Sequence, residues 1–210
     1  MKIKESWGEL YKQRKLIRKR YPEIWSIKII KKHLQVLSKI ISENAMILDI
    51  GAYDRSLEGK IKKIVPSAVY RSMDVDIYQK HDYYDLSVVK EKFNVIVLFE
   101  VIEHLEYEEG INMLEKIYHL LDFGGKLLLT TPNLFHPNRY WDASHRVPYR
   151  YDEIAAVVSS TGLHVKEIYR IYNDAFFRRI LRMYVFSFLH HYLDIDFAKS
   201  ILLIAEKKPE

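Results

Sequence analysis

Apolar residues gather along this chain in short runs, and between the runs they recur at helical spacing. Each run is bounded by residues that favour turns and therefore predicts a buried strand. The predicted strands cover residues 45–50, 68–73, 93–99, 126–131, 164–171 and 200–206. The intervening segments predict helices at 55–64, 107–121, 152–161 and 174–193. We expect Gly124 and Gly125 to end the second of these helices.

Two segments are less regular. Residues 5–43 predict helical structure that Pro22 breaks or kinks, with the apolar positions from Ile27 to Ile41 packing on the core. Residues 82–86 are expected to form a cramped additional strand or its edge.

Strands and helices alternate through most of the chain, which favours an α/β fold with a mostly parallel, doubly wound sheet and helices on both faces. The 210 residues suffice for one such domain. We expect it to span residues 44–210, with a helical insertion near 174–193. Residues 1–43 would form a basic, helical N-terminal extension that packs on the core.

The chain contains no cysteine, which excludes disulfides, thiolate metal ligands and cysteine nucleophiles. No apolar run is long enough for a membrane span, and the first residues are charged from Lys2 onward. We therefore expect a cytoplasmic protein without a signal peptide.

The net charge of +5 is concentrated near the start of the chain, where residues 1–35 hold 11 Lys or Arg against three Glu. This segment predicts a contact with nucleic-acid phosphates, a peripheral contact with an anionic membrane, or a solvated helix face. The aromatic stretch 176–192 has similar alternatives: core packing, a lid over the substrate, or an interfacial helix that grips a lipid-linked or apolar substrate.

The strand at 45–50 breaks at Gly51 into a turn at the carboxyl end of the predicted sheet. Glycine tolerates a positive φ and lets the backbone approach a ligand closely. Ligands of doubly wound sheets bind beyond the carboxyl ends of the strands. The turn therefore predicts a site for a nucleotide-like cofactor.

A second candidate site follows the strand at 93–99. Glu100, Glu103 and His104 share one face if this segment is helical. Together with His145 they would hold Mg²⁺, Mn²⁺ or Zn²⁺. Without a metal, His104 or His145 would act as a general base, and the acids alternatively serve only to stabilise a helix start.

Four landmarks resemble the class I S-adenosylmethionine-dependent methyltransferases. They are Met46–Gly51, Asp74, Phe93–Leu105 and Leu121–Asn133, in the order of that family's motifs. The likeness covers roughly residues 44–171 and the last strand. It implies a Rossmann-like, seven-stranded mixed sheet and S-adenosylmethionine as cofactor.

The resemblance also implies contacts to the cofactor. Asp74, or its neighbour Asp76, would bind the ribose hydroxyls, and Asp85 with Leu86 would meet the adenine. The full predicted set of cofactor residues is Asp49, Gly51, Ala52, Tyr53, Asp74, Asp76, Asp85, Leu86, Phe99 and Glu100. One departure is that Tyr53 and Arg55 stand where the family usually carries further glycines.

The Glu-x-x-Glu-His pattern with a later histidine resembles that of the small-RNA terminal 2′-O-methyltransferases and the ubiquinone-pathway O-methyltransferases. That likeness implies a divalent metal at Glu100, Glu103, His104 and His145, acting as a Lewis acid that lowers the pKa of an acceptor hydroxyl. Glu103, His104 and His145 are accordingly the predicted catalytic residues. The loop 136–149, with Asn138, Arg139, Tyr140, Trp141 and Asp142, would line the acceptor pocket.

These observations predict O-methylation of a small-molecule or glycan-like acceptor. The Asn/Asp-Pro-Pro-aromatic motif of amino-group DNA methyltransferases is absent after the 93–99 strand, and the lack of cysteine excludes cytosine-C5 chemistry. Two alternatives stay open. One is an RNA 2′-O-methyltransferase that uses the basic N-terminal helix, and the other is a non-catalytic adapter on a degenerate methyltransferase fold.

Overall fold

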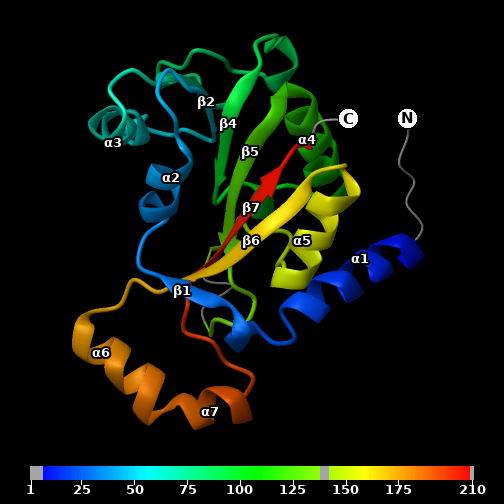
Figure 1. The fold of residues 1–210 in the computed structure, drawn as a ribbon, viewed down its shortest axis with the longest axis vertical. Coiled ribbons are helices and arrows are strands. Elements are labelled where there is room, and N and C mark those ends of the chain that lie inside the picture. The colour runs from blue at the N-terminus through cyan, green and yellow to red at the C-terminus, as the bar shows by residue number, and fades with distance from the viewer. Residues whose placement is uncertain (1–6, 138–141, 209–210) are drawn as a thin grey trace.

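A computed structural model describes residues 7–137 and 142–208 and is built around one seven-stranded sheet (Figure 1). The strand order is β1-β6-β7-β5-β4-β2-β3, and β7 runs antiparallel to both of its neighbours. The predicted doubly wound mixed sheet is therefore confirmed. Its strands are β1 (Lys28–Ile30), β2 (Met46–Ile50), β3 (Val69–Met73), β4 (Phe93–Phe99), β5 (Leu121–Pro132), β6 (His164–Ile171) and β7 (Ser200–Glu206).

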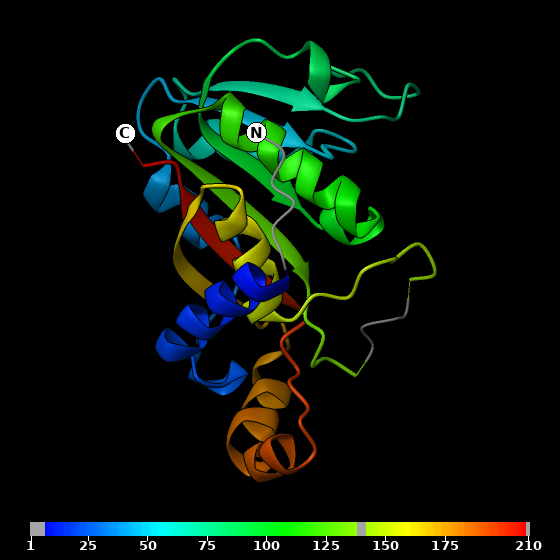
Figure 2. The same ribbon diagram turned by 90° about the vertical axis from the view of Figure 1, so that its right-hand side faces the viewer.

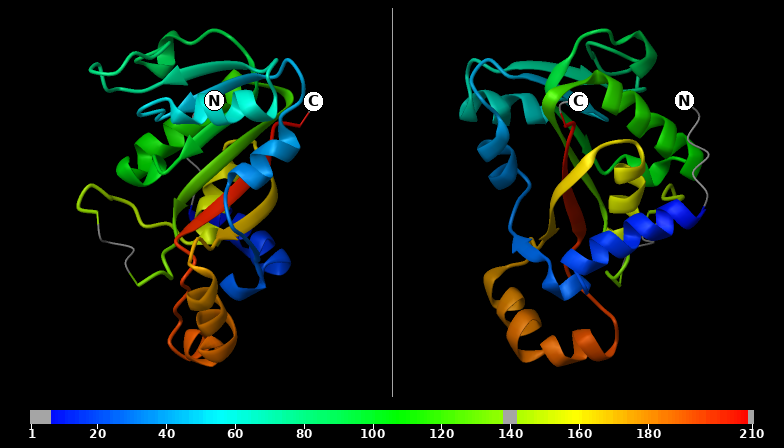
Figure 3. Two further views of the ribbon diagram at one scale, coloured as in Figure 1. Left: turned by 90° about the vertical axis from the view of Figure 1, so that its left-hand side faces the viewer. Right: turned by 45° about the vertical axis from the view of Figure 1, so that its right-hand side comes forward.

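Helices cover both faces of the sheet, as Figures 1 and 3 show. Because side chains alternate along a strand, Ile96 and Leu98 of β4 enter one core while Val95 and Val97 enter the other. The first core lies under α1 (Trp7–Arg20), α4 (Tyr107–Leu120) and α5 (Tyr151–Ser160). The second lies under α2 (Leu34–Ile40) and α3 (Ser56–Ile64).

The prediction of helical structure throughout residues 5–43 is wrong at β1. Helix α1 ends at Arg20, next to Pro22, as the proline predicts. Residues 28–30 instead form an edge strand parallel to β6. The apolar pair Ile29-Ile30 fits both a helix and a strand, and β-branched side chains favour the pleated surface.

Two further predictions are corrected. Gly124 and Gly125 do not end α4, which stops at Leu120, but lie inside β5. Gly124 adopts a φ of +74°, and the pairing of β5 with β4 shifts register between Leu121 and Lys126, on either side of the two glycines. Residues 82–86 form no strand but a single bridge between Tyr83 and Met73, because the Asp82 carboxylate accepts hydrogen bonds from Ser72.

Helix α1 is attached to α5 by a buried carboxylate. Asp152 is fully buried and accepts hydrogen bonds from Arg14 Nε at 3.1 Å and Arg18 Nε at 2.7 Å. Burial alone would raise the pKa of Asp152, but the hydrogen bond from Arg18 and the neighbouring guanidinium charges hold it below the ordinary value. Two of the basic residues near the N-terminus, Arg14 and Arg18, therefore bind an acid of this chain.

Between β6 and β7 the chain forms a helical hairpin that projects from the sheet (Figures 2 and 3). It consists of α6 (Phe176–Ile180), a π-helical turn (Leu181–Val185) and α7 (Ser187–Tyr192). We call residues 174–193 the projecting hairpin. Within the described parts of the chain, no helix has the length and apolar character needed to cross a bilayer.

Candidate functional site

The two candidate sites of the sequence lie against each other. Gly51 follows β2 with a φ of +75°, and the N–H groups of Gly51 and Ala52 both donate to Met73 O at the end of β3. A Cβ atom at Gly51 would lie 2.3 Å from Val101 Cγ2. Only glycine therefore allows the turn after β2 to pack on the segment that follows β4.

Acidic groups surround this turn. Asp74 accepts hydrogen bonds from Tyr53 N at 2.8 Å and Asp76 N at 3.0 Å, which fixes the carboxylate at the end of β3. Tyr53 itself adopts a φ of +45°, and the residue is 71% exposed. Its ring therefore points to solvent and does not fill the turn.

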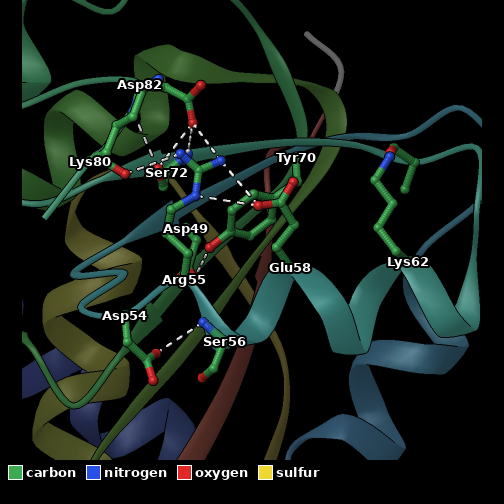
Figure 4. Close-up of polar contacts among 11 residues, drawn as sticks. Asp49, Asp54, Arg55, Ser56, Glu58, Lys62, Tyr70, Ser72, Lys80 and Asp82 are labelled. Carbon is green, nitrogen blue, oxygen red and sulfur yellow. Dashed lines mark hydrogen bonds and ion pairs between the residues drawn. The ribbon is translucent and has the colours of Figure 1, made fainter.

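Arg55 likewise has a positive φ of 58°. Its guanidinium pairs with Glu58 at 3.1 Å and Asp82 at 3.3 Å (Figure 4). Tyr53 and Arg55, which stand where the resembled family usually carries glycines, thus both have a left-handed backbone. Such conformations in non-glycine residues are uncommon and concentrate at functional sites.

Asp49 is buried at the end of β2 and accepts a 2.5 Å hydrogen bond from the Tyr70 hydroxyl (Figure 4). Burial raises the pKa of Asp49 to about 6, and the negative charges of Asp74 and Asp54 add to the shift despite that hydrogen bond. Negative charge therefore accumulates around the turn, which suits a ligand that carries positive charge.

The Asp49 pKa predicts how stability depends on pH. The unfolded chain loses this proton near pH 3.8 and the folded chain near pH 6, so stability falls as pH rises through this window. The asparagine of the Asp49→Asn variant cannot ionise. Its free energy of unfolding should therefore exceed that of the wild type by up to about 3 kcal/mol above pH 6, and should equal it at pH 4. Urea unfolding at both pH values measures the difference.

Asp54→Asn is the matched control in the same turn. Hydrogen bonds from Ser56 lower the pKa of Asp54, so its replacement should bring no gain above pH 6. An Asp49→Asn gain of equal size at pH 4 and pH 8 would contradict the prediction.

The other predicted cofactor residues lie at the same end of the strands. Asp85 is exposed and accepts hydrogen bonds from Ser87 N and Oγ, while Leu86 is buried in the core. Phe99 ends β4 with its ring centroid 4.5 Å from that of His33. Asp76 accepts a hydrogen bond from Tyr78 N.

The segment after β4 forms a 3₁₀ helix at Ile102–His104. Glu100 precedes it with a φ of +54°, and its N–H donates to Thr130 O at 3.1 Å. Although part of Glu100 is exposed, desolvation of its carboxyl group raises its pKa.

Three of the four predicted metal ligands come together. One ligand atom from each of Glu103, His104 and His145 lies within 4.8 Å of the others. Glu100 is not part of this group, because the left-handed backbone and the 3₁₀ turn break the α-helical spacing that the prediction assumed. Its charge is nevertheless close enough to act on Glu103.

Glu103 is the most unusual side chain of the site. It is 1% exposed, and neither carboxylate oxygen has a hydrogen-bond partner among the described residues. Burial, and then the charge of Glu100, raise its pKa to about 8. A cavity of about 10 Å³ lies between Glu103, Thr131 and His145, which is the room that one water molecule or ion takes. A buried acid whose oxygens have no hydrogen-bond partner is unusual, and this marks Glu103 as a candidate ligand-binding group.

The loop after β5 places Ser144, which was not among the predicted residues, between Asp142 and His104. Ser144 Oγ donates to Asp142 Oδ1 at 2.6 Å and lies 2.9 Å from His104 Nδ1. Since the hydroxyl proton is directed to Asp142, His104 Nδ1–H donates to Ser144 and leaves Nε2 with a free lone pair. The Asp-x-Ser spacing at 142–144 was the available signal.

The same loop is attached directly to Glu103. Arg146 N and Val147 N donate to the Glu103 carbonyl at 2.8 and 3.2 Å. His145 is thereby brought to His104, with ring centroids 4.9 Å apart. The predicted acceptor-loop residues Asn138, Arg139, Tyr140 and Trp141 lie outside the described residues.

Comparisons with known proteins agree with this architecture. A family model described as a methyltransferase domain matches residues 19–168. The structure of an S-adenosylmethionine-dependent methyltransferase from Archaeoglobus fulgidus is similar with a TM-score of 0.66 and 16% identity, covering 96% of this chain and 100% of that chain. The search of curated proteins gave no match.

Two other solved structures show how widely this fold is used. Phosphoethanolamine N-methyltransferase 2 of Haemonchus contortus, in complex with S-adenosyl-L-methionine, has a TM-score of 0.60 and 14% identity, covering 84% of this chain and 52% of that chain. The cyclase SpnF has a TM-score of 0.62 and 11% identity, covering 84% of this chain and 80% of that chain. At these identities the structural matches establish the fold and leave the acceptor open.

Proposed function

The chain belongs to the class I S-adenosylmethionine-dependent methyltransferases, and on that premise we propose that it methylates a hydroxyl group of a small-molecule or glycan-like acceptor. The observation that carries the proposal is the buried, unpartnered Glu103 beside His104 and His145. These groups sit next to the Gly51 turn, where the cofactor of this family binds.

The cofactor-binding end fits a positively charged donor. S-adenosylmethionine, when bound, supplies an electrophilic methyl group on a sulfonium and also carries an ammonium group. Asp49 and Asp74 supply the compensating negative charge, and burial, followed by the charges of Asp74 and Asp54, raises the pKa of Asp49. The backbone at Gly51 and Ala52 provides the close surface for the ligand.

The acceptor end fits the removal of a proton from a hydroxyl. In the tautomer set by Ser144 and Asp142, the lone pair on His104 Nε2 would either bind a metal ion or, without a metal, act as the general base. Methyl transfer is an in-line displacement, so much of the remaining acceleration comes from holding the acceptor oxygen opposite the donor. The loop that Glu103 holds through Arg146 and Val147 provides that surface.

We further propose that Glu103, His104 and His145 hold a divalent ion, Mg²⁺, Mn²⁺ or Zn²⁺. The chemistry of the donor set fits, because the Glu103 carboxylate lacks a partner among the described residues and faces the imidazoles. When bound, the ion would act as a Lewis acid that lowers the pKa of the acceptor hydroxyl.

Metal analysis and chelation test this ion. We expect about one equivalent of metal per chain in the purified protein, lost in the His145→Ala variant. EDTA should lower activity, and added metal should restore it. Activity that is unaffected by EDTA, by Glu103→Ala and by His145→Ala would refute the ion and leave His104 as a metal-free base.

Incubation of cell extract with isotopically labelled S-adenosylmethionine, followed by mass spectrometry, tests the acceptor. A methyl ether on a small molecule or glycan supports the proposal, and label on nitrogen, carbon or sulfur refutes it.

Label on RNA would favour the alternative, in which the lysines of α1 contact phosphates. Since Arg14 and Arg18 hold Asp152, the suitable RNA-binding variant is Lys12→Glu with Lys15→Glu and Lys19→Glu. Calorimetry with S-adenosylhomocysteine that shows no binding would favour the adapter alternative.

A further inference from the structure

Nearly half of the exposed large apolar side chains in the described residues lie in the projecting hairpin. Ten of the 21 fall between Phe176 and Leu193. Phe177 is 79% exposed and Tyr192 is 83% exposed. So dense an apolar surface on a soluble fold indicates a binding surface.

The charge of the hairpin is predominantly positive, and its one acid is Asp174. From Ala175 to Leu193 the sequence holds three arginines, two histidines and no acid. Arg182 is engaged, because it pairs with Asp174 and lies 4.1 Å over the Phe197 ring. Arg178 and Arg179 form no ion pair with any acid that the structure describes. The exposed surface therefore combines aromatic rings with unpaired guanidinium groups.

These features fit an anionic lipid surface better than a second copy of the chain. A twofold interface would pack the hairpin against its own copy, whose one acid, Asp174, is already paired with Arg182 and so is not available to Arg178 or Arg179. A phospholipid surface offers both phosphates for the arginines and an apolar layer for the aromatic rings. The two helices hold five and six residues, so they can lie on a bilayer but not cross it.

We propose that the projecting hairpin docks this methyltransferase on the surface of a membrane rich in anionic phospholipid. Aromatic side chains such as Phe177, Tyr184 and Phe188 enter the interface, and Arg178 and Arg179 contact lipid phosphates. This docking is independent of the group that is methylated and goes beyond the proposed function.

The base of the hairpin connects the docking surface to the active edge of the sheet. The hairpin leaves β6 at Ile171 and returns at Ser200, which pairs with Pro132 at the carboxyl end of β5. Buried Asp196 accepts hydrogen bonds from Arg170 and from Asn133 Nδ2, and its N–H donates to Phe135 O. Asn133 and Phe135 begin the loop that carries His145. The docked enzyme would thus hold its acceptor loop close to the lipid surface.

Co-sedimentation of the full chain with vesicles tests the docking. We expect binding to vesicles of phosphatidylcholine with phosphatidylglycerol and little binding to phosphatidylcholine alone. Arg178→Glu with Arg179→Glu should lower the partition coefficient at least about tenfold, since each arginine near an anionic surface strengthens binding about fivefold. The variant Phe177→Ser, Tyr184→Ser, Phe188→Ser should abolish binding.

Lys39→Glu with Lys63→Glu is the matched control. It changes the net charge by the same amount at exposed positions of α2 and α3, so it should lower binding by less than about twofold. Calorimetry with S-adenosylhomocysteine reports whether each variant keeps its fold.

Three results would overturn the proposal. One is wild-type protein that stays in solution with anionic vesicles, and another is equal loss of binding in the arginine and lysine variants. The third is a concentration-dependent dimer, seen by light scattering, that the serine variant abolishes while vesicle binding persists.

Discussion

Replacing Gly51 by alanine is expected to lower the free energy of unfolding by about 3 kcal/mol and to abolish binding of S-adenosylhomocysteine. Two effects add at this position. The φ of +75° is unfavourable for any residue with a Cβ atom, and the new methyl group would lie 2.3 Å from Val101 Cγ2. Relief of that contact must separate the turn after β2 from the segment after β4, and these are the two halves of the site.

Two other glycines separate these effects. Gly124 has a φ of +74°, and a Cβ atom there would meet nothing within 4 Å. Gly124→Ala should therefore lower the free energy of unfolding by only about 1 kcal/mol. Gly59 lies in α3 with open space around it. Because alanine favours the helix more than glycine does, Gly59→Ala should raise the free energy of unfolding by about 0.5–1 kcal/mol. Urea unfolding and calorimetry measure all three variants. Equal losses for Gly51→Ala and Gly124→Ala would show that the contact with Val101 is unimportant.

Replacing Glu103 by glutamine is expected to lower kcat/KM for the acceptor at least about 100-fold while cofactor affinity stays unchanged. The amide keeps the size of the side chain but binds a cation or proton poorly. The unfolding midpoint should not fall, since the carboxylate oxygens have no hydrogen-bond partner among the described residues. Loss of activity without loss of stability is the result that distinguishes a functional acid from a structural one.

Glu108→Gln provides the control, because Glu108 is an exposed acid in the first turn of α4. It should keep full activity. A Glu103→Gln variant with normal turnover, or one that loses activity only because it unfolds, would remove Glu103 from the mechanism.

The bounds of the central strands were predicted well, because a buried strand is a continuous apolar run with polar residues at both ends. The bounds predicted for 93–99 and 200–206 are those of β4 and β7. These strands are apolar runs covered on both faces. The same reasoning failed for the edge strand β1 and for the glycines of the central strand β5, since both carry patterns that suit more than one structure.

The candidate site was partly predictable for a similar reason. Glu103, His104 and His145 stood out by residue type, and the structure brings them together. Ser144 was missed, and Asp142 was expected only to line the acceptor pocket, because their contact with His104 depends on how a loop folds back onto Glu103. The position of Glu100 depends on a backbone angle that local sequence does not indicate.

The place of β7 has a consequence for biosynthesis. This strand inserts between β5 and β6, yet it follows both in the chain. While the nascent polypeptide leaves the ribosome, the middle of the sheet stays open until residues 200–206 emerge. Until then two apolar strand edges are exposed to chaperones and to other nascent chains, so the yield of native protein depends on how quickly synthesis is completed.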